Sequence, residues 1–101
     1  MEEQLVSLEV AKLLKTKGFS AGSNHYLEAP TQSVAQKWLR ETKNVHICIY
    51  NNACGYGYEI CKADNGTHIV NDALKGPNDG GVWDTYEGAL EEGLKRALEL
   101  T

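Results

Sequence analysis

The side chains of this chain best suited to chemistry are thiols and imidazoles. Together these groups bind zinc, and structural zinc sites usually contain close pairs such as Cys-x-x-Cys. The only close pair here is His46 and Cys48, two residues apart in a strand-like stretch and so on one face. Cys61 could lie beside them only if the register of the predicted hairpin placed it across from them. We expect buried thiols rather than a metal site, because three ligands on a flat sheet fit tetrahedral zinc poorly. The full set is His25, His46, Cys48, Cys54, Cys61 and His68.

The other patterns typical of enzymes are weak. Cys54 lies in a turn beside Gly55, but a nucleophilic thiol needs a neighbouring base, and none is near it in the sequence. Glu91 and Glu92 are adjacent, so they diverge by about 100° on a helix and cannot share a substrate. The segment 75–81 lacks the spacing of a phosphate-binding loop. We therefore predict that the protein is not an enzyme and has no cofactor. A thiol- or metal-dependent enzyme is the least favoured alternative.

Two helices are expected in the first half of the chain. The first spans residues 8–17, with Ser7 as its N-cap and Gly18 in the left-handed position that ends it. The second begins at the N-cap Thr31 and ends near residue 42. The residues predicted to face the core are Val10, Ala11, Leu13 and Leu14 in the first helix and Val34, Ala35, Trp38 and Leu39 in the second.

The last eighteen residues predict the clearest helix. Asp84 and Glu87 have the spacing of a capping box, which would start it. Gly93 would allow a close approach to the sheet. The opposite face, including Glu91 and Glu92, is expected to be solvated. The apolar stripe consists of Tyr86, Ala89, Leu90, Gly93, Leu94, Ala97 and Leu98.

Strand-forming residues lie between the second and third helices. Residues 45–50 and 56–63 predict an antiparallel hairpin, residues 67–70 a third strand, and residues 24–29 a short further one. Short connections between consecutive strands require an antiparallel meander. The predicted fold class is α+β, a three- or four-stranded antiparallel meander with three helices packed on one face, within a single domain over residues 1–101.

Alternation along the strands gives this sheet two unlike faces. Val45, Ile47 and Ile49 belong to the face under the helices. The second face is partly apolar and sparsely charged, which often marks a protein contact. We therefore predict a small accessory or adaptor protein that binds an unknown protein partner or forms a homodimer, unless the N-terminal segment or residues 71–83 cover this face. The predicted contact residues are His46, Cys48, Tyr50, Glu59 and Cys61.

Nucleic acid is the alternative partner. From Thr31 onward the order α-β-β-β-α looks like that of the double-stranded RNA-binding domain. That family places lysines at the start of its last helix to reach phosphates, whereas Tyr86 and Glu87 stand there in this chain. Only the order of elements is shared, and it does not carry function. The alternative function is a nucleic-acid-binding module that uses the basic residues of the 31–43 helix, which are Lys37, Arg40 and Lys43.

Charge and composition limit the class of protein further. A net charge of −4 excludes a protein whose whole surface grips phosphates. The first seven residues carry acids where a secretory signal has bases, and no stretch approaches the roughly 18 apolar residues that span a membrane. Three cysteines cannot form a complete internal disulfide framework. We therefore expect a reduced, cytoplasmic protein without membrane contact.

Three segments carry a family resemblance. They are VAKLLKTKGF (Val10–Phe19), APTQSVAQKWLRE (Ala29–Glu41) and TYEGALEEGLKRALEL (Thr85–Leu100). Together they resemble a family of short proteins of anaerobic gut bacteria and of their prophages or mobile elements, to which no activity is assigned. The resemblance implies an intracellular accessory protein of a bacterium or phage, and it transfers no functional residues.

Overall fold

The computed structural model describes residues 5–19, 31–71, 76 and 82–101, which form three helices and one three-stranded antiparallel sheet. This arrangement confirms the predicted α+β class. The short strand predicted at residues 24–29 lies outside the described residues. The elements are α1 (Leu8–Thr16), α2 (Gln32–Thr42), β1 (Val45–Asn52), β2 (Gly55–Lys62), β3 (His68–Asn71) and α3 (Tyr86–Leu100).

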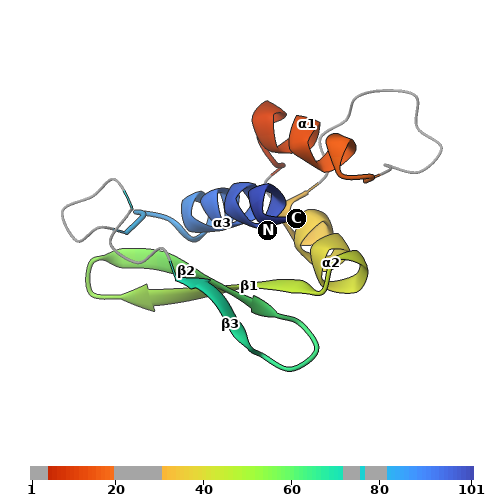
Figure 1. Cartoon of the computed structure of the whole chain (residues 1–101). Coiled ribbons are helices and arrows are strands. Elements are labelled where there is room, and N and C mark those ends of the chain that lie inside the picture. Colours follow the sequence, from red (N-terminus) through yellow and green to blue (C-terminus); the bar gives the residue numbers. More distant parts are fainter. Residues whose placement is uncertain (1–4, 20–30, 72–75, 77–81) are drawn as a thin grey trace.

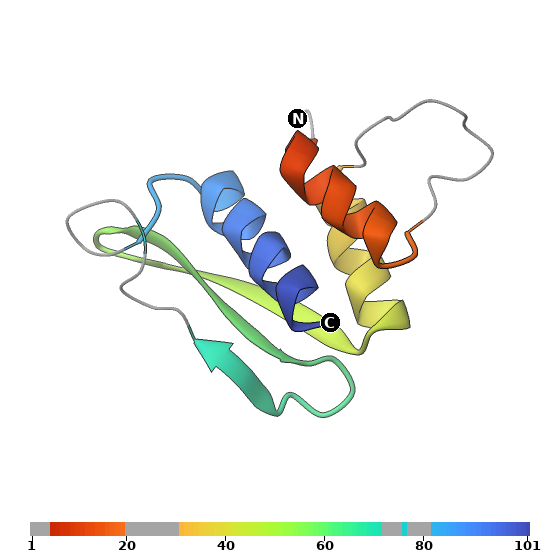
Figure 2. The ribbon, with the colours of Figure 1, turned by 45° about the horizontal axis from the view of Figure 1, so that its top comes forward.

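All three helices lie on one side of the sheet, whose strand order is β1-β2-β3 (Figure 1). α3 lies across β1 and β2, and α2 packs against β1 and α3. α1 packs on α3 on the side away from the sheet (Figure 2). The buried apolar residues form one core cluster, which extends from the sheet past α3 to α1. Val6, Val10 and Leu14 contribute to this cluster from α1 and from the residues just before it.

Both ends of α1 follow the sequence signals. The hydroxyl of Ser7 accepts a hydrogen bond from the backbone N–H of Val10 at 3.2 Å, which confirms it as the N-cap. At the other end the N–H of Phe19 donates to the carbonyl of Leu14 at 2.9 Å. Gly18 precedes Phe19 with a φ of 105°, where a side chain would be strained. This is the Schellman ending that the sequence predicts.

α2 has the predicted N-cap but a different buried face. Thr31 accepts the N–H of Val34 at 3.3 Å. Ala35 and Leu39 are buried as expected, whereas Val34 is 48% exposed. The inner stripe begins instead at Gln32, which is buried. The prediction for Val34 was wrong because it counted apolar side chains only, while Gln32 can be buried once its amide has hydrogen-bond partners.

The predicted start of α3 was also wrong by one residue. Thr85, not Asp84, is the N-cap, and its hydroxyl accepts the N–H of Gly88 at 2.9 Å. The backbone of Trp83 is paired with Tyr56 by two hydrogen bonds of 2.7 and 2.8 Å, so the chain leaves the sheet just before the helix begins. Tyr86 is 43% exposed rather than in the core, while the other six residues of the predicted stripe are buried.

Gly93 brings α3 close to the sheet, as the sequence predicts. A Cβ atom at this position would stand 2.8 Å from Cγ2 of Ile47 and 3.3 Å from Cγ of Tyr58. The first of these distances is shorter than carbon atoms tolerate without movement. The contact with Ile47 and Tyr58 also identifies the helix-facing side of β1 and β2. The predicted orientation of the Val/Ile face towards the helices is thereby confirmed.

Candidate functional site

The side of the sheet opposite the helices carries all five predicted contact residues. β1 and β2 pair His46 with Cys61, Cys48 with Glu59 and Tyr50 with Gly57. These partners alternate with the residues that face α3, so they share the other face. His68 of β3 joins them, because it pairs with Cys61 and its ring contacts Glu59. We call this surface the open sheet face, and it consists of His46, Cys48, Tyr50, Gly57, Glu59, Cys61 and His68.

Tyr50 lies across Gly57 on the open sheet face. A Cβ atom at Gly57 would stand 2.6 Å from Cζ of the Tyr50 ring. Only glycine leaves room for the ring in this position, which explains a glycine inside a strand. Gly57 is buried although α1, α2 and α3 all lie on the other side of the sheet. The ring of Tyr50 therefore forms an apolar surface over the middle of β2. The glycine within a predicted strand was the available signal for this close contact, and sequence reasoning did not use it.

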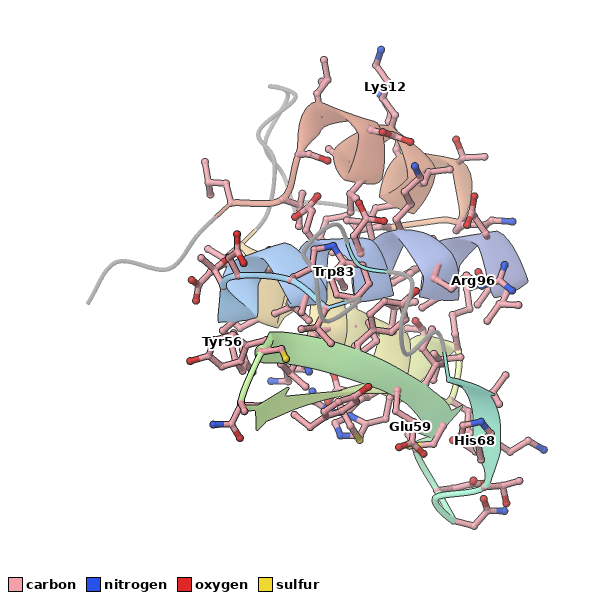
Figure 3. All side chains as sticks on the ribbon, turned by 90° about the vertical axis from the view of Figure 1, so that its left-hand side faces the viewer. Lys12, Tyr56, Glu59, His68, Trp83 and Arg96 are labelled. Atoms are coloured by element: carbon pink, nitrogen blue, oxygen red, sulfur yellow. The ribbon has the colours of Figure 1, made fainter. Side chains whose placement is uncertain are left out.

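Glu59 carries the one carboxylate among the described side chains of the open sheet face. Its Oε1 atom lies 2.9 Å from Nδ1 of His68 on the neighbouring strand (Figure 3). The two side chains are 40% and 51% exposed, so the pair adds little to stability. Its effect is to give one oxygen of the Glu59 carboxylate a hydrogen-bonding partner on the neighbouring strand.

Cys48 and Cys61 lie diagonally across the two paired strands. Their Sγ atoms are 3.8 Å apart, and Cys61 is only 8% exposed. Burial, followed by the hydrogen bond with Cys61, raises the pKa of the Cys48 thiol to about 11. The folded chain therefore holds this proton more tightly than the unfolded chain does. The resulting stabilisation is complete below about pH 9 and is lost as the pH rises towards 11.

The thiols are expected to react in a fixed order with iodoacetamide. Cys54 is exposed in the β1–β2 turn and should be modified first. Cys48 should react slowly at pH 8, with a rate that rises about tenfold per pH unit until the pH approaches the pKa, because only the thiolate attacks. Peptide mass spectrometry after timed labelling measures both rates. Equal rates for Cys48 and Cys54 at pH 8 would contradict this environment.

Within the described ranges, no group of three or more His, Cys, Asp or Glu side chains is arranged to hold a metal ion. Nδ1 of His46 is buried and has no hydrogen-bond partner in the described part of the chain. The open sheet face combines an aromatic ring, two thiols, two imidazoles and a carboxylate that is hydrogen-bonded to one of the imidazoles.

The basic residues of α2 form a separate surface. Lys37 and Lys43 are exposed and Arg40 is half-buried. The ammonium group of Lys43 lies 5.7 Å from the centre of the Trp38 ring, a distance typical of a cation–π contact. Lys43 therefore has a structural role at the end of α2. Binding of nucleic acid by these three residues stays a prediction.

Glu91 has a role that the sequence did not reveal. It was expected to be solvated, but its carboxylate accepts the backbone N–H of Ser7 at 2.8 Å and the side-chain amide of Gln32 at 3.0 Å. The same amide donates to the carbonyl of Glu87 at 2.9 Å. One carboxylate on α3 thus joins the first turns of α1 and α2. This contact explains why Gln32 is buried.

No helix in the described part of the chain is long and apolar enough to cross a membrane. Comparisons of the chain with protein-family models, with curated proteins and with solved structures found no match.

Proposed function

We propose that the protein is a small non-enzymatic accessory protein that acts by protein–protein contact through the open sheet face. The observation that carries this proposal is the position of that face. The helices lie on the other side of the sheet, so a partner can reach Tyr50 and Cys48 without displacing a helix. The surface is aromatic and poor in charge, which is the composition of interface centres.

A second copy of the chain is the partner that these features fit best. The chain has a net charge of −4, so two copies repel one another over most of their surfaces. Repulsion is expected to be weakest at the open sheet face, because Glu59, the one carboxylate among its described residues, is hydrogen-bonded to His68. Two sheets that pack face to face stand about 10 Å apart, which leaves room for one layer of interdigitated side chains from each. The helices would then form the two outer layers of the dimer.

The sequence resemblance adds a setting to this proposal. Segments 10–19, 29–41 and 85–100 resemble short proteins of gut bacteria and their mobile elements. An intracellular accessory role in such an organism or phage agrees with a small chain that binds another protein and performs no chemistry of its own.

The proposal predicts that Tyr50→Lys disrupts self-association. Light scattering after size exclusion should give a dimer for the wild type and a monomer for the variant, because an ammonium group would be buried without a partner. Tyr86→Lys is the matched control, since Tyr86 is exposed on α3 away from the open sheet face, and it should leave the dimer intact. Thermal unfolding checks that both variants fold.

A monomeric wild type would contradict the homodimer. In that case affinity capture with the wild type and with Tyr50→Lys, from cells that produce the protein, tests for a different partner on the same face. Captured proteins that are identical for the two baits would contradict the proposed contact surface altogether.

A further inference from the structure

The outer edge of β1 carries backbone groups that the described residues leave without a hydrogen-bond partner. In an antiparallel pair, residues point their N–H and C=O groups alternately towards the neighbouring strand and away from it. Tyr56 bonds to Trp83 through both groups, on the side of β2 away from β1. Asn51 is opposite Tyr56 in the register, so its own groups point away from β2, and alternation gives Ile49 the same direction.

α2 closes one point of this outer edge. The alternation also directs the carbonyl of Ile47 outwards, and Nε2 of Gln36 donates to it at 2.7 Å. This bond independently confirms the direction of the groups. Beyond it, no described residue bonds to the outward groups of Ile49 or Asn51. The stretch 49–51 therefore offers two N–H donors and two C=O acceptors, and α2 lies beside its closed end.

The free stretch lacks the features that usually protect an edge strand. Natural proteins place lysines, other charged residues or prolines on such edges to prevent further pairing. Residues 45–52 contain none of these. Ile49 is half-buried and packs against the core, whereas Asn51 is exposed. Two donors and two acceptors in this alternating pattern match one more extended backbone, as in peptide recognition by strand addition.

Arg40 gives this edge a charge preference. It follows Gln36 by one helical turn, and residues four apart lie on the same side of a helix. Gln36 reaches the edge at Ile47, so Arg40 lies on the flank of α2 that borders the edge. Arg40 is half-buried, and no described residue forms an ion pair with it. A carboxylate beside the closed end of the edge would supply the missing partner.

We propose that an extended segment of another protein adds to residues 49–51 as an antiparallel strand and places a carboxylate near Arg40. Antiparallel addition pairs one residue of the segment with Ile49 and the residue two positions before it with Asn51, which gives four backbone hydrogen bonds. The segment then runs towards α2, so the residue after this ladder carries the carboxylate. A second copy of β1 fits this edge less well, because residues 45–52 have no carboxylate.

This inference goes beyond the proposed function and does not depend on it, because the outer edge of β1 and the open sheet face are different surfaces. The probe is the capped peptide acetyl-Thr-Val-Thr-Val-Glu-amide, whose valines are to pair with Asn51 and Ile49. Hydrogen exchange of the isotope-labelled full-length chain, followed by nuclear magnetic resonance, measures each amide. In the free protein the amides of Ile49 and Asn51 should exchange fast, while those of Cys48 and Tyr50, which bond to β2, should be protected. Saturating peptide should protect Ile49 and Asn51 as well.

Matched peptides and variants separate the two parts of the proposal. Methyl groups on the backbone nitrogens of both valines remove two donors, and this peptide should bind at least about tenfold more weakly. Glutamine in place of glutamate should weaken binding to the wild type about fivefold, the size of a favourable exposed ion pair. Arg40→Gln should bind these two peptides equally. Lys37→Gln should keep the preference for glutamate, because Lys37 points about 100° away from Gln36 on the helix.

Several results would overturn the proposal. Slow exchange of Ile49 and Asn51 in the dilute free protein would mean that the edge is already covered. No protection with the peptide, or equal binding of its methylated form, would remove strand addition, and equal binding of the glutamate and glutamine peptides by the wild type would remove the role of Arg40. Protection that appears at high protein concentration without peptide would assign the edge to a second copy. A DNA duplex that binds the wild type but not Arg40→Gln, while the peptide does not bind, would assign Arg40 to nucleic acid.

Discussion

Replacement of Leu94 by alanine is expected to lower the free energy of unfolding by about 2–5 kcal/mol. Leu94 is fully buried in α3, in the core that the helix shares with the sheet and α1. It follows Gly93, where the backbone of α3 lies so close to Ile47 and Tyr58 that the helix has little freedom to settle into a cavity. The cost should therefore include a cavity contribution as well as the lost burial.

The matched control for this prediction is Leu100→Ala. Leu100 is 41% exposed at the end of the same helix, so its replacement should change stability by no more than about 0.5 kcal/mol. Urea unfolding followed by circular dichroism measures both variants. Similar losses for Leu94→Ala and Leu100→Ala would show that the buried face of α3 is wrongly assigned.

Replacement of Glu91 by alanine is expected to cost about 2 kcal/mol, a large effect for a residue on the polar side of a helix. Its carboxylate accepts hydrogen bonds from the N–H of Ser7 and from the amide of Gln32, and the amide belongs to a buried residue. In a capping box, a glutamate three residues into a helix accepts the N–H of the N-cap. In α1 that position is Val10, whose side chain cannot accept a hydrogen bond. Glu91 of α3 accepts the N–H of Ser7 instead.

Glu92 provides the control for Glu91, because it is the same residue type one position later and is exposed. Glu92→Ala should stay within about 0.5 kcal/mol of the wild type in urea unfolding. The double variant Glu91→Ala with Gln32→Ala should cost less than the sum of the two single variants, since both remove one shared hydrogen bond. Strict additivity would mean that Glu91 does not act through Gln32.

The local signals in the sequence located both ends of α1, the start of α2 and the two faces of the sheet. Ser7 and Thr31 start their helices because a side-chain oxygen can satisfy an N–H three residues later, and this requires no information from distant parts of the chain. Period-two alternation placed His46, Cys48 and Tyr50 on one face, and this inference likewise requires no information from distant parts of the chain.

The errors concern contacts that join distant segments. Gln32 and Glu91 are 59 residues apart, and no local pattern indicates that they meet. Val34 was assigned to the core by its apolar side chain, although the packing of α2 on α3 turns it outward. The start of α3 was misplaced because Asp84 and Thr85 are both good N-caps, and the pairing of Trp83 with Tyr56 decides between them.

In the candidate site, too, the local features could be predicted from the sequence and the contact between two strands could not. Alternation could place Cys48 and Cys61 on one face, but their proximity depends on the register of the hairpin. That register follows from a two-residue turn at Ala53 and Cys54, whereas the sequence predicts a longer turn over residues 51–55. Because a shift of one residue moves side chains to the opposite face, the pair could not be predicted without the observed pairing.

The open sheet face as a contact surface is tested most directly by nuclear magnetic resonance spectra over a dilution series of the isotope-labelled protein. If two copies meet through this face, dilution should shift the signals of His46, Cys48, Tyr50 and Cys61 most strongly and leave those of α1 nearly unchanged. Shifts centred on the exposed apolar residues Leu8 and Val34 instead, or no shift at any residue, would contradict self-association through the open sheet face.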